Sequence, residues 1–489
     1  MFEQLFRPAL KAGYFSNQLQ QVFEFEADAL LKLDIPRFYV PTDSDALSID
    51  PGNGIPKFLW ESPLKTVERR INHMSETALQ HHREVIRQSL GRKPKILTSP
   101  LTRGEMQSLV QEYADLTLAM AGPAVKSTLW TLPSFVEVEP PLIERLGLYS
   151  GDLGTLIFLA AADRFLHRST VEPLLEHFRD KLEKFQVRSE PLGIGNGVGS
   201  LIYGTLLLGS ILEDQSWYNL SERLFCQLTE EQVRIELEPD LLYGIAGLLV
   251  AVGRLYHLRP DDQKAKLAGV CLEKLVESFH PDEGWKRPNG DSALGFAHGA
   301  AGISYAAAIA GDIFRDNRAQ LLAEKGLEFD RRYFREAEHN WPSTINDPPP
   351  ASMRAWCSGL IGMLVSRIGI WRSWRDPAVL AEIETNLPFL PDLLGLDHWC
   401  CGSAGVAEAL IYAAQVFDRK ELLEKARTTI DQAVRRALKT TYYRFSPHVG
   451  QNYCFQPSLF RGLAGLGFSL IRISEPASLP SITAFEIDP

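Results

Sequence analysis

Cysteine is scarce in this chain, with six in 489 residues. So sparse a set cannot form the disulfide network of a small secreted scaffold, and we therefore expect a protein of the reducing cytoplasm. Three of the six, Cys226, Cys271 and Cys454, lie in apolar or mixed surroundings, where a free cysteine usually packs as a small hydrophobic residue. We expect these three to be ordinary buried thiols.

Long hydrophobic runs are also missing. The longest candidates, such as residues 201–212, are interrupted by residues like Tyr203 and Gly204. None reaches the roughly 20 apolar residues that a membrane-spanning helix needs. The start, Met1-Phe2-Glu3-Gln4, lacks the basic and then apolar order of a secretory signal. We therefore expect no membrane span.

Positive charge is in deficit, because 51 lysines and arginines face 61 aspartates and glutamates, for a net charge of −10. Nucleic-acid binding needs a basic surface, so nucleic acid is not an expected partner. What the chain does have is 45% hydrophobic residues and enough length for two or three domains. It can therefore bury a large core.

A glycine motif recurs along the second part of the chain. Its form is Gly-x-x-Gly followed by an apolar run, and only the second copy ends in another residue, Ser200. Successive copies lie 43 to 60 residues apart, a period typical of repeat architectures. The copies begin at Gly151, Gly197, Gly244, Gly299, Gly359, Gly402 and Gly462.

Each repeat contains two helical patterns. The stretch that follows each motif, such as residues 303–308, is small and apolar, which predicts a buried inner helix. The stretches between motifs, such as 171–187 and 420–440, have apolar residues at helical spacing, which predicts amphipathic outer helices. Such hairpins bury their inner helices best in a closed ring. The predicted fold is all-α, an α/α toroid of seven inner and seven outer helices; an open solenoid is the alternative.

Two cysteine motifs suggest a metal site. They are Trp356-Cys357-Ser358-Gly359 and Asp397-His398-Trp399-Cys400-Cys401-Gly402. Thiolates that converge from separate segments suit zinc, and a catalytic zinc keeps a fourth position open. The hypothesis is three cysteine ligands and one vacancy, with His398 in place of Cys401 as an alternative ligand.

The chain resembles a known family, the lanthionine cyclases. Three motifs carry the resemblance: Gly295-Phe296-Ala297-His298-Gly299-Ala300-Ala301-Gly302, Trp356-Cys357-Ser358-Gly359 and Cys400-Cys401-Gly402-Ser403-Ala404-Gly405. The tail from residue 457 to 473 is similar to the C-terminal end of class II lanthipeptide synthetases, which fuse a dehydratase to a cyclase. The double cysteine resembles their Cys-Cys-Gly subgroup. The resemblance covers residues 140–489.

The resemblance implies a toroid with Zn²⁺ at its mouth. It also implies that the thiol of a peptide cysteine adds to dehydroalanine or dehydrobutyrine in a dehydrated precursor peptide, giving a thioether ring. The matching positions make Cys357 and Cys400 zinc ligands. Cys401 takes the place where most cyclases carry a histidine, which makes this site all-sulfur.

Three further residues match or approach the catalytic positions of the family. His298 is the expected acid that protonates the α-carbon, because histidine can exchange a proton near neutral pH. Asp240 is expected to orient His298 or to help deprotonate the thiol, with a plain helix cap as the alternative. Arg354 is a candidate to stabilise the oxyanion.

The segment before residue 140 has a resemblance of its own. Residues 33–38, 43–47 and 62–90 look like the end of a dehydratase domain. We therefore expect domain 1–139 to be a helical extension of dehydratase origin and domain 140–489 to be the cyclase. The chain would then be the cyclase half of a split or truncated class II synthetase, to which a separate dehydratase could dock. A helical cap on the toroid is the alternative for the extension.

Other functions remain open at this level. A carbohydrate-active toroid would need two carboxylates at the mouth, and Asp152 and Asp240 are the only obvious acids there. A non-catalytic peptide-binding toroid with a structural zinc would also explain the cysteines. A relative that adds glutathione would differ only in the source of the thiol.

Overall fold

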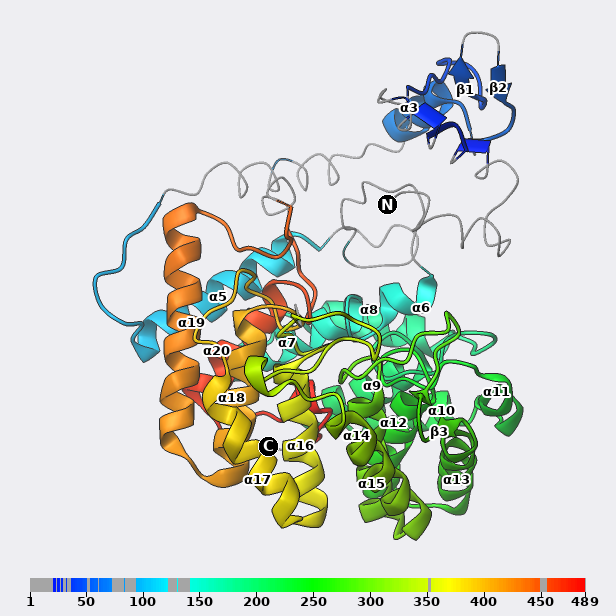
Figure 1. Cartoon of the computed structure of the whole chain (residues 1–489). Coiled ribbons are helices and arrows are strands. Elements are labelled where there is room, and N and C mark those ends of the chain that lie inside the picture. The colour runs from blue at the N-terminus through cyan, green and yellow to red at the C-terminus, as the bar shows by residue number, and fades with distance from the viewer. Residues whose placement is uncertain are drawn as a thin grey trace. The chain divides into compact units, whose positions relative to one another are not determined.

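The computed structural model describes scattered positions between 21 and 32, position 83, position 130, and the ranges 37–50, 53–59, 61–72, 94–121, 141–350, 353–448 and 455–488. The chain divides into two compact units, Met1–His82 and Arg83–Pro489. The first contains an antiparallel hairpin of β1 (Leu47–Asp50) and β2 (Asn53–Ile55), followed by helix α3 (Pro63–Asn72) (Figure 1). Helix α3 lies in the predicted helical stretch 62–90. Most of the rest of that stretch, and residues 33–36, lie outside the described residues.

The second unit is built from helices in two layers (Figure 1). Within the described residues, seven helices that are buried over most of their length form the inner layer: α7 (Asp152–Leu166), α9 (Val198–Leu212), α12 (Ile245–Leu258), α14 (Ala300–Phe314), α16 (Leu360–Trp374), α18 (Ser403–Phe417) and α20 (Leu463–Ser474). Seven amphipathic helices form the outer layer: α5 (Arg103–Ala119), α8 (Glu172–Glu183), α10 (Gln215–Phe225), α13 (Asp262–Glu277), α15 (Asn317–Arg331), α17 (Pro377–Asn386) and α19 (Lys420–Thr440).

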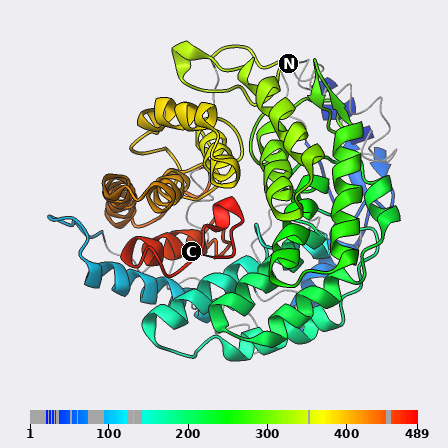
Figure 2. The same cartoon turned by 90° about the horizontal axis from the view of Figure 1, so that it is seen from below.

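The inner layer closes into a ring. Each inner helix packs against the next one, and α20 packs against α7 to complete the circle. Figure 2 shows this ring in a view from below, with the C-terminal segment at its centre. The predicted α/α toroid is confirmed, and closure through α20 and α7 rules out the open solenoid.

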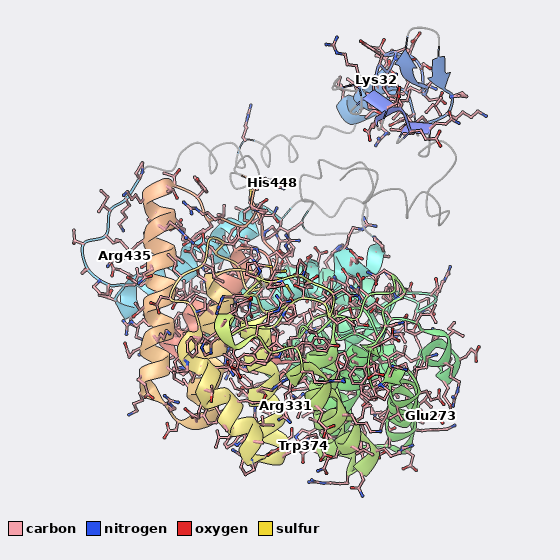
Figure 3. All side chains as sticks on the ribbon, in the orientation of Figure 1. Lys32, Glu273, Arg331, Trp374, Arg435 and His448 are labelled. Carbon is pink, nitrogen blue, oxygen red and sulfur yellow. The ribbon has the colours of Figure 1, made fainter. Side chains whose placement is uncertain are left out.

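Helix α5 supplies an outer helix that the repeat alone does not provide. Between α20 and residue 488, the last that the structure describes, no outer helix follows, and α5 packs against both α20 and α7. The amide of Leu101 donates to Asp431 on α19 at 2.7 Å, and Arg435 on α19 donates to the carbonyl of Leu97 at 2.9 Å. Figure 3 shows Arg435 beside this segment. Part of the predicted extension 1–139 therefore packs within the toroid unit.

The repeated glycines sit where each loop meets an inner helix. The first glycine of every motif is the N-cap of its helix, and the last motif residue, which is glycine in all copies but the second, lies in the first turn. A Cβ on Gly302 would stand 2.0 Å from the carbonyl of Phe296, and the same close approach recurs in five other copies. Only glycine lets the loop pack this tightly on the helix. The five are Gly154, Gly247, Gly362, Gly405 and Gly465.

The end of the chain fills the centre of the ring. The short helix η4 (Ile482–Ala484) and the residues after it are buried, and different inner helices bind them. Tyr203 on α9 donates to the carbonyl of Glu486 at 2.6 Å, and Arg254 on α12 pairs with the Glu486 carboxylate at 2.8 Å. Tyr412 on α18 donates to the same carboxylate at 2.9 Å. The tail therefore joins helices from opposite parts of the ring.

Short elements complete the second unit. They are α6 (Leu142–Leu146), α11 (Glu230–Ile235), the hairpin of β3 (Phe279–His280) and β4 (Gly284–Trp285), and the 3₁₀ turns η1 (Glu336–Glu338) and η2 (Leu387–Phe389). None of the helices in the described ranges combines the length and the apolar character that crossing a bilayer would require.

Candidate metal centre and active site

The loops that precede the inner helices meet at one end of the ring, which we call the mouth. Backbone hydrogen bonds of 2.8–3.1 Å join each of these loops to the next and close into a circle. The circle holds the site residues in a fixed order around the mouth. Its bonds run from Tyr149 to Gly195, Gly195 to Leu242, Leu242 to Ala297, Ala297 to Cys357, Trp356 to Cys400, Cys400 to Phe460 and Phe460 to Tyr149.

Three sulfurs converge on one side of the mouth. Cys357 Sγ and Cys401 Sγ lie 3.8 Å apart, and Cys401 Sγ lies 3.3 Å from Cys400 Sγ. The three sulfurs lie within 4.8 Å of one another. Cys400 is buried, whereas Cys357 and Cys401 are partly exposed. The structure therefore brings together the three cysteines that the sequence singled out.

This sulfur cluster fits a zinc ion. Zinc binds thiolate at about 2.3 Å in a tetrahedron, which places ligand sulfurs about 3.8 Å apart. The observed separations of 3.3 and 3.8 Å are close to that value, so small side-chain rotations would admit the ion. Three sulfurs occupy three corners of the tetrahedron and leave the fourth to another ligand.

The three thiols share their protons unequally. Hydrogen bonds from Cys357 and Cys401 lower the pKa of Cys400 well below its usual range. The hydrogen bonds of Cys357 with Cys400 and Cys401, together with burial, raise the pKa of Cys357. One thiolate is thus stabilised by neighbouring thiols in the absence of metal, and thiolate is the form that binds zinc.

Beside the cluster lies a histidine–aspartate pair. His298 Nδ1 is 2.7 Å from Asp240 Oδ2, and the amide of Ala297 donates to the carbonyl of Cys357 at 3.1 Å. Asp240 is fully buried, while about a third of the His298 side chain is exposed. The neighbouring loop thus holds His298 next to the cysteines, with Nε2 free of the Asp240 contact.

Asp240 does two things at once. Its Oδ1 accepts the amides of Tyr243 at 2.7 Å and Gly244 at 3.1 Å, which fixes the loop before α12. Its Oδ2 contacts His298, and Arg287 lies 3.9 Å from the same oxygen. The N-cap of α12 is Gly244, with no side-chain cap, so Asp240 is not a plain helix cap. Its carboxylate fixes the preceding loop and contacts His298.

Arg354 is placed differently from the other candidates. Its guanidinium donates to the carbonyls of Glu338 and Phe389, and its side chain is partly buried. Both carbonyls belong to connections that carry the cysteines. Glu338 lies between α15 and α16, as Cys357 does, and Phe389 lies between α17 and α18, as Cys400 and Cys401 do. In this structure Arg354 therefore joins two loops.

His398 supports the cysteine loop. Its Nδ1 accepts the amide of Cys401 at 3.2 Å, and burial lowers the pKa of His398 to about 4. The group of converging ligand atoms consists of Cys357, Cys400 and Cys401, without His398, in the part of the chain that the structure describes. Its buried Nε2 has no hydrogen-bond partner among the described residues.

Two residues at this site were not identified from the sequence. The hydroxyl of Tyr149 hydrogen-bonds Cys400, and its ring stacks on Phe460 with centroids 4.9 Å apart. Burial and the neighbouring Cys400 raise the pKa of Tyr149 well above its usual range. Arg461 is exposed in the next loop, and its positive charge acts on Tyr149, His398 and Cys401. Tyr149, in the first loop, comes close to the cysteines only because the ring closes. Arg461 lies in the loop that follows the cysteine loop, directly before the first glycine of the last motif, which is the signal that could have indicated it.

The other three cysteines were predicted to be buried thiols, and the structure confirms this for only one of them. Cys271 is fully buried, as predicted, and burial raises its pKa to about 12. The prediction for Cys226 was wrong, because this residue is exposed as the C-cap of α10, where the last turn meets solvent. Cys454 lies outside the described residues.

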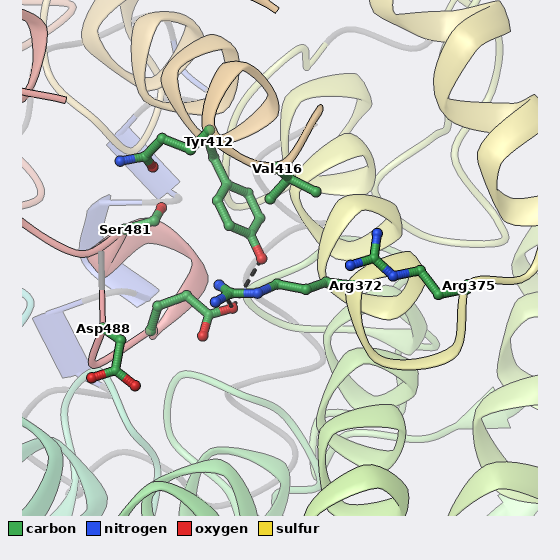
Figure 4. Close-up of a pocket in the computed structure, with 8 residues that line it drawn as sticks. Arg372, Arg375, Tyr412, Val416, Ser481 and Asp488 are labelled. Carbon is green, nitrogen blue, oxygen red and sulfur yellow. Dashed lines mark hydrogen bonds and ion pairs between the residues drawn. The ribbon is translucent and has the colours of Figure 1, made fainter. Parts of the chain in front are cut away.

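A cavity of about 180 Å³ lies at the other end of the ring. Arg372 and Arg375 at the end of α16 line it, together with Tyr412 and Asp488 (Figure 4). Helix α16 starts next to Cys357 and has 15 residues, so this cavity lies roughly 20 Å from the sulfurs. It is therefore separate from the sulfur cluster.

Comparison with known proteins agrees with this architecture. The family described as lanthionine synthetase C-like protein matches residues 143–484, which is more than half of the chain. Nisin cyclase has a similar structure, with a TM-score of 0.57 and 16% identity over 78% of this chain and 96% of that chain. None of the curated proteins matches the sequence.

Fainter likenesses extend to other proteins. The unsaturated glucuronyl hydrolase of Bacillus sp. GL1 has a TM-score of 0.42 and 15% identity over 66% of this chain and 94% of that chain. The cellobiose 2-epimerase of Bacillus thermoamylovorans B4167 has a TM-score of 0.38 and 11% identity over 59% of this chain and 86% of that chain. These values are too low to support an argument. The family match over residues 143–484 supports the conclusion that this chain belongs to the lanthionine synthetase C-like family.

Proposed function

We propose that this protein is a zinc-dependent cyclase that forms thioether rings in a dehydrated peptide. The observation that supports it most directly is the sulfur cluster of Cys357, Cys400 and Cys401 beside the His298–Asp240 pair. A metal site with one open corner and an adjacent proton donor is what thiol addition needs.

In this proposal Cys357, Cys400 and Cys401 would hold Zn²⁺, which would supply a positive charge that favours the thiolate form of a peptide cysteine. The sulfur attacks the β-carbon of dehydroalanine or dehydrobutyrine. A carbon–sulfur bond forms, and the π electron pair moves onto the carbonyl oxygen. His298, held by Asp240, then gives a proton to the α-carbon. One proton leaves the thiol and one reaches carbon, so the reaction needs no oxidant or reductant.

The third thiolate distinguishes this site from one with two cysteines and a histidine. Three thiolate ligands would bring one more negative charge to the site than two thiolates and a neutral histidine. This additional charge would favour a more nucleophilic substrate sulfur. We propose that the chain belongs with the Cys-Cys-Gly class II cyclases, and that a separate dehydration step supplies its substrate.

The test is a reaction with a precursor peptide that has been dehydrated beforehand. We expect about one zinc per chain, and loss of free peptide thiol without change in peptide mass. Cys357→Ala should lose both zinc and cyclisation, whereas Cys226→Ala, on the outer layer, should keep both. A wild-type protein that holds zinc but leaves the peptide thiols reactive would contradict the proposal.

That outcome would favour the second candidate, a peptide-binding toroid with a structural zinc. All-sulfur coordination is typical of structural sites, although these usually have four protein ligands. The partial exposure of Cys357 and Cys401 argues for access to the metal, because a structural site is usually closed.

Arg354 is retained as one proposed candidate for stabilising the oxyanion. Its present bonds to the carbonyls of Glu338 and Phe389 would have to break before it could reach the substrate. Arg354→Gln should therefore lower kcat if the side chain moves on peptide binding, and should change mainly loop stability if it does not.

A further inference from the structure

Each loop at the mouth has a residue at an equivalent position of the repeat, directly before the first glycine of its motif. In four loops its side chain lies on the rim: His298 contacts Asp240, Cys401 belongs to the sulfur cluster, Tyr243 stacks on His298, and Asn196 donates to Tyr243 at 3.1 Å. This position in the repeat therefore predicts which side chains lie at the mouth.

In the last loop this position is Arg461, directly before Gly462. The amide of Cys400 donates to the carbonyl of Phe460 at 3.0 Å, so the chain at Arg461 lies against the cysteine loop. Around the mouth, the loop of His298 adjoins Cys357 on one side of the cluster. The loop of Arg461 adjoins Cys400 on the other side.

Arg461 is exposed, and no hydrogen bond or ion pair holds its guanidinium to another residue in the described part of the chain. Arg354, by contrast, already bonds two carbonyls. An exposed arginine beside sulfurs that become negatively charged suits an anion, because its fork of N–H groups matches carboxylate and enolate oxygens.

We propose that Arg461 is the anion-binding residue of this site, which faces the sulfur cluster from the side opposite His298 and binds the carbonyl oxygen of the dehydro residue as negative charge develops on it. This assignment rests on the proposed cyclase function for the identity of the substrate. The placement of a cation beside the cysteines does not depend on that function, and can be tested without it.

The first experiment measures charge at the cluster in metal-free protein. Cys401 is alkylated with iodoacetate, an anion, or with iodoacetamide, its neutral counterpart of similar size, and each product is quantified by peptide mass. The ratio of the two rates cancels the fraction of thiolate, so it reports the local charge that the reagent meets. At low ionic strength, Arg461→Gln should lower the iodoacetate-to-iodoacetamide ratio about three- to tenfold, and added salt should shrink the difference.

Two variants serve as controls. Arg461→Lys keeps the charge and should restore most of the ratio. Arg223→Gln removes an exposed arginine from the outer helix α10, with the same change in net charge, and should leave the ratio unchanged. The placement is wrong if Arg461→Gln keeps the wild-type ratio, or if Arg223→Gln lowers it equally.

The second experiment measures cyclisation of a dehydrated peptide. Arg461→Gln should lower kcat about tenfold or more, and Arg461→Lys should recover only part of it, because lysine lacks the planar fork. A lowered alkylation ratio with unchanged kcat would overturn the anion-binding role. A lowered ratio in a protein whose wild type does not cyclise would refute the proposed function and this catalytic role, and leave the position of Arg461 intact.

Discussion

Tyr149 shows how a single hydroxyl can tune a metal site. It is buried and hydrogen-bonds Cys400, whose pKa is lowered by the neighbouring thiols while the pKa values of Cys357 and Cys401 are raised. A donor on a ligand thiolate offsets part of the negative charge that three cysteines bring. Partners of this kind commonly change metal affinity by a factor of 10 or more when removed.

We predict that Tyr149→Phe weakens zinc binding about tenfold, measured by competition with a chelating indicator. The ring of phenylalanine keeps the stacking on Phe460, so the effect isolates the hydroxyl. Tyr243→Phe removes a hydroxyl that bonds Asn196 instead, and should leave zinc affinity unchanged. Equal affinities in Tyr149→Phe and wild type would show that the hydrogen bond does not support the metal.

We predict that His298 contributes to the rate of cyclisation and not to zinc binding. Its ring bonds Asp240 and lies in a different loop from the cysteines. His298→Ala should keep its zinc and lose about 10²- to 10⁴-fold in kcat, since general acid catalysis contributes that much. The measurement follows the loss of free peptide thiol with time, and the zinc content is determined on the same samples. Cyclisation at the parent rate would remove His298 from the mechanism.

At the scale of elements, the close contact between loops decides where the ligands lie. A Cβ on Gly295 would stand 2.4 Å from the carbonyl of Cys357, which accepts the amide of Ala297. The two loops can therefore approach only if this residue is glycine. The position of a metal ligand thus depends on a residue in the preceding repeat.

We predict that Gly295→Ala displaces Cys357 and lowers zinc occupancy more than it lowers the unfolding temperature. Gly269→Ala is the matched control, because its added methyl on α13 meets nothing within 4 Å. That control should be neutral or stabilising by about 0.5–1 kcal/mol. Full zinc occupancy in Gly295→Ala would mean that the loops adapt without moving the ligand.

The sequence predicted the elements well where the signal is local. Each Gly-x-x-Gly motif marks an inner helix because the same tight loop packs in each repeat, and Cys357, Cys400 and Cys401 follow from their motifs. Helix α5 was not recognised as an outer helix, because its partners, α20 and α7, are fixed by ring closure and not by the repeat. Tyr149 was missed for the same reason, since the first loop reaches the cysteines only in the closed ring. Arg461 was missed although it directly precedes the first glycine of the last motif, as His298 and Cys401 precede theirs.

At the scale of the molecule, the C-terminal tail stabilises the ring from within. Glu486 is buried and pairs with Arg254 at 2.8 Å and Arg372 at 3.3 Å, which belong to α12 and α16. Next to the metal loop, the indole of Trp356 donates to the carbonyl of Thr483 at 2.9 Å. No motif in the sequence of the tail predicts this central position.

We predict that Glu486→Gln lowers the free energy of unfolding by about 3 kcal/mol, because it leaves buried arginine charge without its partner. Glu475→Gln breaks an exposed pair with Arg103 and should cost less than about 1 kcal/mol. Urea unfolding followed by circular dichroism compares the two. Equal small losses would show that the tail is not a central support.

The most direct test of the account is X-ray absorption at the zinc edge, before and after a dehydrated peptide with a free cysteine is added. We predict three sulfur neighbours at about 2.3 Å and one oxygen or nitrogen neighbour in the free protein. Binding of the peptide should change this to four sulfurs. A zinc with four sulfurs in the free protein, or one whose shell does not change with the peptide, would contradict the claim that Cys357, Cys400 and Cys401 leave a corner open for the substrate thiol.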